Sequence, residues 1–257
     1  PEICPKMATE CGADQTKGVI EVGPGFGVLT RELAARANKV VAIELDKRLP
    51  AVLAETLRDF DNVKVVQADV MEVDLHQLIQ DEFSGLDVLV CANLPYYITS
   101  PVIMKLLEEK LPVESLTVMV QKEAAVRICA APGTRACGAV SVAVQYYSQP
   151  QILFDVPRDC FFPAPNVDSA VIRLNIRKEP PVKLETEEKQ FFKLVKAAFG
   201  QRRKTVLNSL STGLGKPKEE LSAALQQAGI APTARAEQLT MEQFGTLCNL
   251  LFPNKAQ

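Results

Sequence analysis

The stretch Val19-Ile20-Glu21-Val22-Gly23-Pro24-Gly25-Phe26-Gly27-Val28-Leu29-Thr30 decides the fold of this chain. Its apolar start, residues 19–22, is typical of a buried strand, and three alternating glycines follow it. From Val28 to Ala37 the apolar residues return with helical spacing. A strand, a glycine turn and a helix in this order let the backbone approach a nucleotide-like ligand closely, because glycine has no side chain in the way. The stretch therefore predicts an α/β domain with a nucleoside site at this turn.

The spacing of the glycines differs from that of a dinucleotide site. The dinucleotide fingerprint places glycines at its first, third and sixth positions. Here the sixth position is Val28, and the third glycine is Gly27. Taken alone, the motif leaves open a tight structural turn without a ligand, and the segments that follow favour a ligand site.

Acidic residues follow the next two predicted strands. Residues 40–44 form the second predicted strand, and its last residue, Glu44, lies 21 positions after Gly23. A carboxylate at this place accepts hydrogen bonds from both ribose hydroxyls of a bound nucleoside. The third predicted strand, residues 63–67, is followed by Asp69, which we expect to accept from an adenine amino group, although a helix cap is an alternative. We therefore expect Gly23, Gly25, Glu44 and Asp69 to bind the cofactor.

The fourth predicted strand, residues 86–92, is almost wholly apolar and is therefore expected to be central. It ends in Asn93-Leu94-Pro95-Tyr96. Ligands of open α/β sheets bind beyond the carboxyl ends of the strands, so this tetrad is expected to face the nucleoside.

The tetrad suits methylation of the exocyclic amine of adenine, a weak nucleophile because its lone pair is delocalised into the ring. The side-chain oxygen of Asn93 and a backbone carbonyl near Pro95 can accept its two N–H bonds and aim the lone pair at a methyl group. Tyr96 and Phe161 offer faces on which the base can stack once it is unpaired or extruded. The methyl donor would be S-adenosylmethionine, whose chemistry needs no metal, covalent nucleophile or strong base.

Composition sets limits on the class of protein. With 257 residues and 47% hydrophobic residues, the chain can form a large core, and global disorder is excluded. No apolar run reaches the length of a membrane span. The seven cysteines include no Cys-x-x-Cys pair, and His76 is the only histidine, so we expect no disulfide framework, no metal site and no histidine base. This cysteine usage favours a cytoplasmic location.

Composition changes at residues 178–181, Lys-Glu-Pro-Pro, which we interpret as a linker. We expect an α/β domain over residues 1–178 and a small all-helical domain over residues 179–257. The second domain carries a local basic group in a chain of net charge −2: Lys193, Lys196, Arg202, Arg203 and Lys204. Arg202, Arg203 and Lys204 are predicted to contact RNA phosphates, and a solvated helix face is the alternative.

Several motifs together resemble the ribosomal RNA adenine N6,N6-dimethyltransferase family, and most closely its bacterial small-subunit, kasugamycin-resistance branch. The likeness runs from about Gly18 to the C-terminus, and the motifs fall in the order of the family. The motifs that carry it are Glu21-Val22-Gly23-Pro24-Gly25-Phe26-Gly27, Glu44, Gln67-Ala68-Asp69-Val70, Asn93-Leu94-Pro95-Tyr96-Tyr97-Ile98-Thr99-Ser100-Pro101, Phe161-Phe162-Pro163-Ala164-Pro165-Asn166-Val167-Asp168-Ser169 and Ala198-Phe199-Gly200-Gln201-Arg202-Arg203-Lys204-Thr205.

The resemblance implies a Rossmann-like class I S-adenosylmethionine-dependent methyltransferase domain. It implies two methyl transfers to each of two adjacent adenines in a hairpin loop near the 3′ end of small-subunit (16S) ribosomal RNA. It also implies cofactor contacts at Gly23, Glu44, Asp69 and Asn93. We expect the chain to act as a monomer on the ribosomal RNA of an assembling small subunit.

One family feature is not found in the printed residues. The family carries a Gln-Asn-Phe-Leu segment upstream of the glycine loop, which helps to close over cofactor and RNA. We expect a form of the chain without this segment to bind the cofactor weakly or to fail to turn over.

Three alternatives agree less well with the sequence than the small-subunit enzyme. Large-subunit ribosomal RNA methyltransferases of the antibiotic-resistance type share the core, but Asn-Leu-Pro-Tyr-Tyr-Ile-Thr-Ser-Pro and Gln-Arg-Arg-Lys-Thr favour the small-subunit enzyme. A DNA adenine or protein glutamine methyltransferase more typically has Pro-Pro-Tyr, whereas residue 94 is leucine. A non-catalytic ribosome-assembly factor is disfavoured by the intact Gly23, Glu44, Asp69 and Asn93, which do not exclude an added assembly role.

Overall fold

The structure is a computed structural model that describes residues 2–253. The chain divides into two compact units. Unit 1 contains residues 1–125 and 148–176, and unit 2 contains residues 126–147 and 177–257. Within the described residues, every helix is too short or too polar to cross a lipid bilayer.

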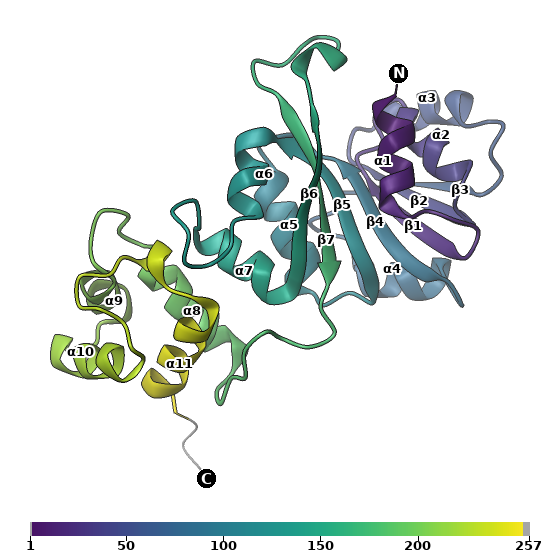
Figure 1. Ribbon diagram of the computed structural model, residues 1–257. Helices are drawn as coiled ribbons and strands as arrows, with labels where there is room; N and C mark the ends of the chain where they lie inside the picture. Colours follow the sequence, from purple (N-terminus) through teal and green to yellow (C-terminus); the bar gives the residue numbers. More distant parts are fainter. Residues whose placement is uncertain (1, 254–257) are drawn as a thin grey trace. The chain divides into compact units, whose positions relative to one another are not determined.

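Unit 1 is built on a seven-stranded sheet (Figure 1). Its strands are β1 (Lys17–Val22), β2 (Lys39–Glu44), β3 (Val63–Gln67), β4 (Asp87–Asn93), β5 (Val113–Gln121), β6 (Ser148–Val156) and β7 (Ser169–Ile176). The spatial order is β3-β2-β1-β4-β5-β7-β6. The first five strands in the chain run parallel to one another, and β7 lies antiparallel to both β5 and β6. The predicted α/β class is confirmed.

One helix precedes β1, and the other helices of unit 1 follow the parallel strands, as the alternating pattern of an α/β fold requires. They are α1 (Ile3–Cys11), α2 (Val28–Ala34), α3 (Leu49–Thr56), α4 (Leu75–Glu82), α5 (Thr99–Glu108) and α6 (Lys122–Ile128), the last of which crosses into unit 2. α1 and α2 pack on one face of the sheet, where Met7 and Leu33 share a core with Leu89 of β4. The opposite face is covered too, because Val90 of β4 is also fully buried, and α4 and α5 lie on that side (Figure 1).

Unit 2 is helical. It contains α7 (Ala139–Tyr147), α8 (Glu188–Ala198), α9 (Val206–Leu214), α10 (Lys218–Gln227) and α11 (Met241–Leu251). Phe191 of α8, Leu210 of α9 and Phe244 of α11 are buried in one core. The close packing of α8 and α9 depends on Gly213, where an added Cβ would stand 2.7 Å from the Cβ of Ala197.

The observed division into units differs from the division predicted from the sequence, which has a single boundary between residues 178 and 179. The chain passes between units after Ala125, Tyr147 and Ile176. Residues 126–147 belong to the helical unit because Val142 and Tyr146 of α7 are part of its core. The sequence Ala-Val-Ser-Val-Ala-Val-Gln-Tyr-Tyr of α7 is rich in β-branched and aromatic residues, which gives little helical signal.

Candidate active site

The register of three neighbouring strands brings the predicted site residues to one edge of the sheet. Val22 of β1 pairs with Ile43 of β2 on one side and with Ala92 of β4 on the other. The next residue of each strand is therefore Gly23, Glu44 or Asn93, all at the same level. β1 is also where the strand order reverses, because β2 and β4 flank it. In open α/β sheets the ligand crevice lies at this switch point.

The glycine turn leaves open space where a ligand would lie. Gly23 has φ +72° and Gly25 has φ +57°, a region that disfavours every residue with a side chain. Among the described residues, no atom of another segment lies within 4 Å of a Cβ built at either glycine. Gly27, at φ +84°, has a different role, since a Cβ there would stand 3.1 Å from Cδ2 of Leu53 and meet α3.

The carboxylate of Glu44 is held against this turn. The backbone N–H of Gly25 donates to Oε2 of Glu44 at 3.2 Å, and the N–H of Asp46 donates to Oε1 at 2.8 Å. Glu44 is 6% exposed, so little of its carboxylate faces bulk water. A carboxylate oxygen can accept two hydrogen bonds, so each oxygen retains the capacity for one further donor.

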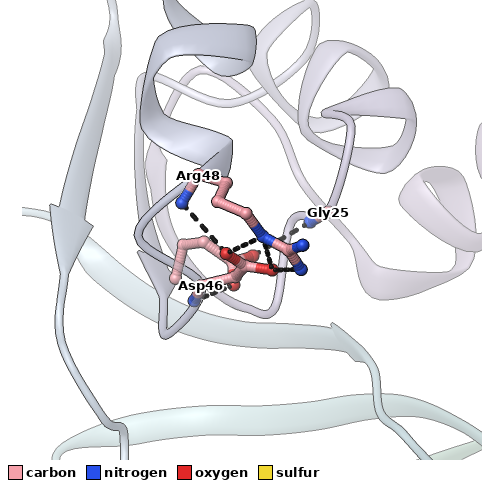
Figure 2. Close-up of polar contacts among 4 residues, drawn as sticks. Gly25, Asp46 and Arg48 are labelled. Carbon is pink, nitrogen blue, oxygen red and sulfur yellow. Dashed lines mark hydrogen bonds and ion pairs between the residues drawn. The ribbon is translucent and has the colours of Figure 1, made fainter.

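Asp46 and Arg48 form further polar contacts in the turn that follows β2, next to Gly25 (Figure 2). Nη2 of Arg48 donates to Oδ2 of Asp46 at 2.6 Å, and Nε donates to Oδ1 at 3.0 Å. These bonds, together with the N–H of Arg48, lower the pKa of Asp46 to about 2. The carboxyl group of Asp46 is therefore ionised over the ordinary pH range.

Asp69 lies two residues beyond β3 and is half-buried. Its Oδ1 accepts from the backbone N–H of Met71 at 2.8 Å, and its carbonyl accepts from Glu72 and Val73. It does not cap a helix: the N-cap of α4 is Asp74, which accepts from the N–H of Gln77. Oδ2 of Asp69 has no partner among residues 2–253. This oxygen is the acceptor that an adenine amino group would need.

Exposed apolar side chains follow the ends of the same strands. Phe26 in the glycine turn is 68% exposed, Leu45 after β2 is 63% exposed, and Met71 after β3 is 42% exposed. Apolar side chains of this kind can cover the faces of a purine ring, while the carboxylates contact its edge and its ribose. The residues at this edge therefore fit a nucleoside with a planar base.

In the turn Asn93-Leu94-Pro95, the side-chain amide of Asn93 and the backbone carbonyl of Leu94 have no hydrogen-bond partner among the described residues. Asn93 is exposed at the end of β4, whereas the side chain of Leu94 is 2% exposed. The carbonyl of Pro95 already accepts from the N–H of Ile98 at 3.1 Å and from Oγ1 of Thr99 at 3.3 Å. Both lone pairs of this carbonyl are thus engaged at the start of α5.

The two aromatic residues expected beside the corner lie differently from each other. Tyr96 is half-buried, and its hydroxyl lies 2.8 Å from Oγ of Ser169, the first residue of β7. This bond ties the corner after β4 to the segment before β7. Phe161 is also half-buried and packs against the core beneath α1 and α2.

Comparison with known proteins decides the family. A model of the family described as ribosomal RNA adenine dimethylase matches residues 2–252. The chain belongs to the ribosomal RNA adenine dimethylase family. Its fold is therefore that of the class I S-adenosylmethionine-dependent methyltransferases, and its reaction is the transfer of methyl groups from S-adenosylmethionine to ribosomal RNA adenine.

Relatives and solved structures agree with this assignment. The chain is 50% identical over 255 residues to the ribosomal RNA small subunit methyltransferase A of Geobacillus thermodenitrificans, covering 98% of this chain and 87% of the relative. It is 54% identical over 230 residues to the protein of that name from Alkaliphilus metalliredigens, covering 89% and 80%. A dimethyladenosine transferase from Plasmodium falciparum is 25% identical with TM-score 0.77, covering 96% and 94%. The 23S rRNA methyltransferase ErmE is 28% identical with TM-score 0.70, covering 97% of both chains.

A buried carboxyl in the strand before the glycine turn was not singled out from the sequence. Glu21 of β1 is 1% exposed, and burial, with a contribution from the charge of Glu44, raises its pKa to about 8. The hydroxyl of Thr30 in α2 lies beside this carboxyl and partly opposes the rise of its pKa. The sequence did contain a signal for this, since a carboxyl lies inside the apolar run Val19–Val22. Burial of an ionisable group in a strand usually shifts its pKa.

The basic group of the dimethylase lies wholly in unit 2. Lys193 and Lys196 are on the exposed side of α8, opposite buried Phe191 and Leu194. Arg202, Arg203 and Lys204 are exposed in the segment between α8 and α9. In the described part of the chain, no carboxylate forms an ion pair with any of these five side chains. Their charge is therefore available to an external anion.

Proposed function

We propose that this dimethylase methylates N6 of two adjacent adenines in a hairpin loop near the 3′ end of small-subunit (16S) ribosomal RNA, giving N6,N6-dimethyladenine. The main support for the proposal is the register of β1, β2 and β4. In this register Gly23, Glu44 and Asn93 lie side by side at the carboxyl edge of the sheet, where the strand order reverses. The choice of the small subunit is supported by relatives about 50% identical that are named small subunit methyltransferase A.

Gly23, Gly25, Glu44 and Asp69 are proposed to hold the cofactor. The open space over the two glycines lets the cofactor lie against the backbone. Glu44 has one unused acceptor site on each oxygen for the ribose hydroxyls, and Oδ2 of Asp69 is an acceptor for the adenine amino group. When bound, S-adenosylmethionine supplies a methyl group carried on a positively charged sulfur.

Asn93 and Leu94 are proposed to orient the target amine. The side-chain oxygen of Asn93 accepts one N–H of the amine, and the carbonyl of Leu94 accepts the other. Leu94 is preferred to Pro95 because the Pro95 carbonyl already has two donors. These two bonds favour a more tetrahedral nitrogen and fix the direction of its lone pair, which is positioning combined with electrostatic stabilisation. Asn93 is also proposed to contact the cofactor.

Tyr96 is proposed to support the target base with its ring. The bond of its hydroxyl to Ser169 restrains the ring, so that little further ordering is needed when the base arrives. Phe161 remains a candidate for the opposite face, although its packing against the core leaves only part of the ring available.

Arg202, Arg203 and Lys204 are proposed to bind RNA phosphates. They have no carboxylate partners among the described residues, and Arg and Lys contacts to phosphate fix position rather than sequence. The selected hairpin is therefore proposed to be recognised by its shape within an assembling small subunit. The seven cysteines are free thiols, which supports action in the reducing cytoplasm, and we propose that the enzyme acts as a monomer.

Mapping of the methylated positions tests the proposal. The enzyme is incubated with S-adenosylmethionine and unmodified small subunits, and in parallel with large subunits and with DNA. Mass mapping is expected to find two adjacent dimethyladenines near the 3′ end of the small-subunit RNA and none in the other samples. Methyl groups found on large-subunit RNA instead would contradict the proposed substrate.

A further inference from the structure

Two pairs of consecutive aromatic residues lie at the same edge of the sheet in unit 1. Tyr96-Tyr97 follows β4, and Phe161-Phe162 lies in the segment between β6 and β7. Ser169, the first residue of β7, pairs with Gln121 at the carboxyl end of β5, so this segment and the end of β4 share one edge. The bond between Tyr96 and Ser169 joins the two segments directly.

In each pair the first ring is turned towards the protein and the second towards solvent. Tyr96 is hydrogen-bonded and half-buried, and Phe161 packs against the core. In contrast, Tyr97 is 84% exposed and Phe162 is 103% exposed. These are the two largest exposed fractions among the exposed large apolar side chains of the described residues.

Such exposure is unusual in a protein that has a core in which to bury aromatic rings. Burial of an aromatic side chain stabilises a fold by about 1.5–3 kcal/mol, which these two rings do not contribute. Exposed apolar side chains beside a ligand site often mark a contact surface. Here the adjoining site takes a base from an unpaired stretch of RNA, so the nucleotides next to that base must pass the same edge.

We propose that Tyr97 and Phe162 stack on the unpaired bases that flank the target adenine and so hold the RNA loop in register with the Asn93-Leu94 corner. This inference rests on the proposed function. Base–aromatic stacking contributes roughly 1–3 kcal/mol per base and tolerates any base, because every base has a flat face. Tyr97 and Phe162 are positioning residues: they contact the neighbours of the reacting base and not the reacting amine.

The two rings predict a kinetic signature that differs from that of the basic group. Loss of a stacking ring weakens RNA binding without changing the number of phosphate contacts, so the salt dependence of binding is unchanged. Because the rings do not contact the amine or the cofactor, kcat and the affinity for S-adenosylmethionine are also unchanged.

The test uses Tyr97→Ala, Phe162→Ala, the double variant, and the ring-preserving Tyr97→Phe and Phe162→Tyr. Ile152→Ala is the matched control, since Ile152 is an exposed apolar residue of β6 in the same unit. Steady-state methylation of unmodified small subunits gives KM and kcat. A hairpin RNA with 2-aminopurine next to the target adenines reports stacking through quenching of its fluorescence.

Each alanine variant is expected to raise KM about five- to tenfold, with kcat within twofold, and the double variant to raise it further. The alanine variants should relieve the quenching of 2-aminopurine, and the ring-preserving variants should behave like the wild type. If the wild type is active but the double variant has unchanged KM and unchanged quenching, the stacking role is overturned. The proposed function is not affected by that result. A rise in KM on whole subunits with unchanged quenching on the hairpin would also overturn the stacking role, since the rings would then contact another ribosomal component. A wild-type enzyme that methylates no small-subunit adenine would defeat the proposed function itself.

Discussion

The backbone N–H of Gly25 donates to Oε2 of Glu44 at 3.2 Å, so the glycine turn and the acidic end of β2 form one rigid corner. The second oxygen of Glu44 is fixed in the same way by the N–H of Asp46 at 2.8 Å. A carboxylate that is already oriented loses little freedom when it binds hydroxyl groups, which favours tight binding. Two residues separated by 19 positions in sequence are therefore joined at the place where we propose that the cofactor binds.

The first prediction concerns this carboxylate. Glu44→Gln should weaken binding of S-adenosylmethionine at least tenfold, because hydrogen bonds to a charged acceptor contribute roughly 1.5–3 kcal/mol. Isothermal titration calorimetry measures the change, and Glu55→Gln, at an exposed position of α3, is the control. An unchanged affinity for Glu44→Gln would remove this residue from the cofactor site.

The second prediction separates backbone strain from ligand contact. Gly25→Ala and Gly215→Ala both place a side chain at positive φ, +57° and +67°, with no atom of another segment within 4 Å of the new Cβ. Each should lower the free energy of unfolding by roughly 1–2 kcal/mol. Only Gly25→Ala should also weaken S-adenosylmethionine binding, because its methyl group enters the open space over the turn. Equal affinities in the two variants would show that this space is not used.

The third prediction concerns the target amine. Asn93→Ala should reduce kcat more than tenfold, a rise of roughly 1.4 kcal/mol or more in the barrier, because it removes one acceptor for the reacting amine. Binding of S-adenosylmethionine should weaken much less than turnover, because Glu44 and Asp69 are proposed to supply the other polar contacts to the cofactor. Single-turnover methylation and calorimetry separate the two effects. Wild-type turnover by the variant would exclude Asn93 from the active site.

The fourth prediction concerns the buried carboxyl of Glu21. Its pKa is raised by burial to about 8, from an ordinary value of 4.5. Between these values the folded chain keeps a proton that the unfolded chain loses. The contribution to stability is therefore fully present below about pH 4.5, and is lost as the pH rises through the folded pKa, by about 1.4 kcal/mol per pH unit at most.

The neutral variant Glu21→Gln removes this titration. Its stability advantage over the wild type should grow from pH 5 to pH 8 and then level off, as measured by denaturant unfolding at each pH. Glu55→Gln should show no such trend, since Glu55 is exposed. A pH-independent difference between Glu21→Gln and the wild type would show that Glu21 has an ordinary pKa in the folded chain.

The fifth prediction concerns the RNA phosphates. Replacing Arg202 and Arg203 by alanine should weaken RNA binding and reduce the slope of log affinity against log salt by about two, roughly one for each cation removed. Replacing Lys178 and Lys218, two exposed lysines of unit 2, makes the same change in charge and should leave the slope unaltered. A slope that does not change for the arginine variant counts against this surface.

Local patterns were sufficient for the parallel half of the sheet. Residues 63–67 were predicted as a strand and form β3 with the same bounds, because β-branched residues between polar turns give an unambiguous signal. Residues 73–77 are compatible by sequence with either a polar connection or the start of a helix, and in the structure Asp74 caps α4.

The hydrogen-bonding state of each site residue could not be read from the sequence. Pro95 was expected to be near the second acceptor, but its carbonyl is engaged by Ile98 and Thr99 because α5 begins there. Similarly, the outward turn of Phe162 and the inward packing of Phe161 depend on which ring meets the core under α1. The first outcome depends on the exact residue at which α5 begins, and the second depends on contacts between residues far apart in the chain.

The sequence by itself determined the strand–turn–helix unit at Val19–Thr30, the acidic residues after the next two strands, and the motif order that marks a ribosomal RNA adenine dimethylase. These are local features, set by glycine geometry and by the period of apolar residues. Only the tertiary structure decided that β1 lies between β2 and β4, and that residues 126–147 join the helical unit. Strand order and unit membership depend on which apolar surfaces are buried together, and that choice is made by the whole chain.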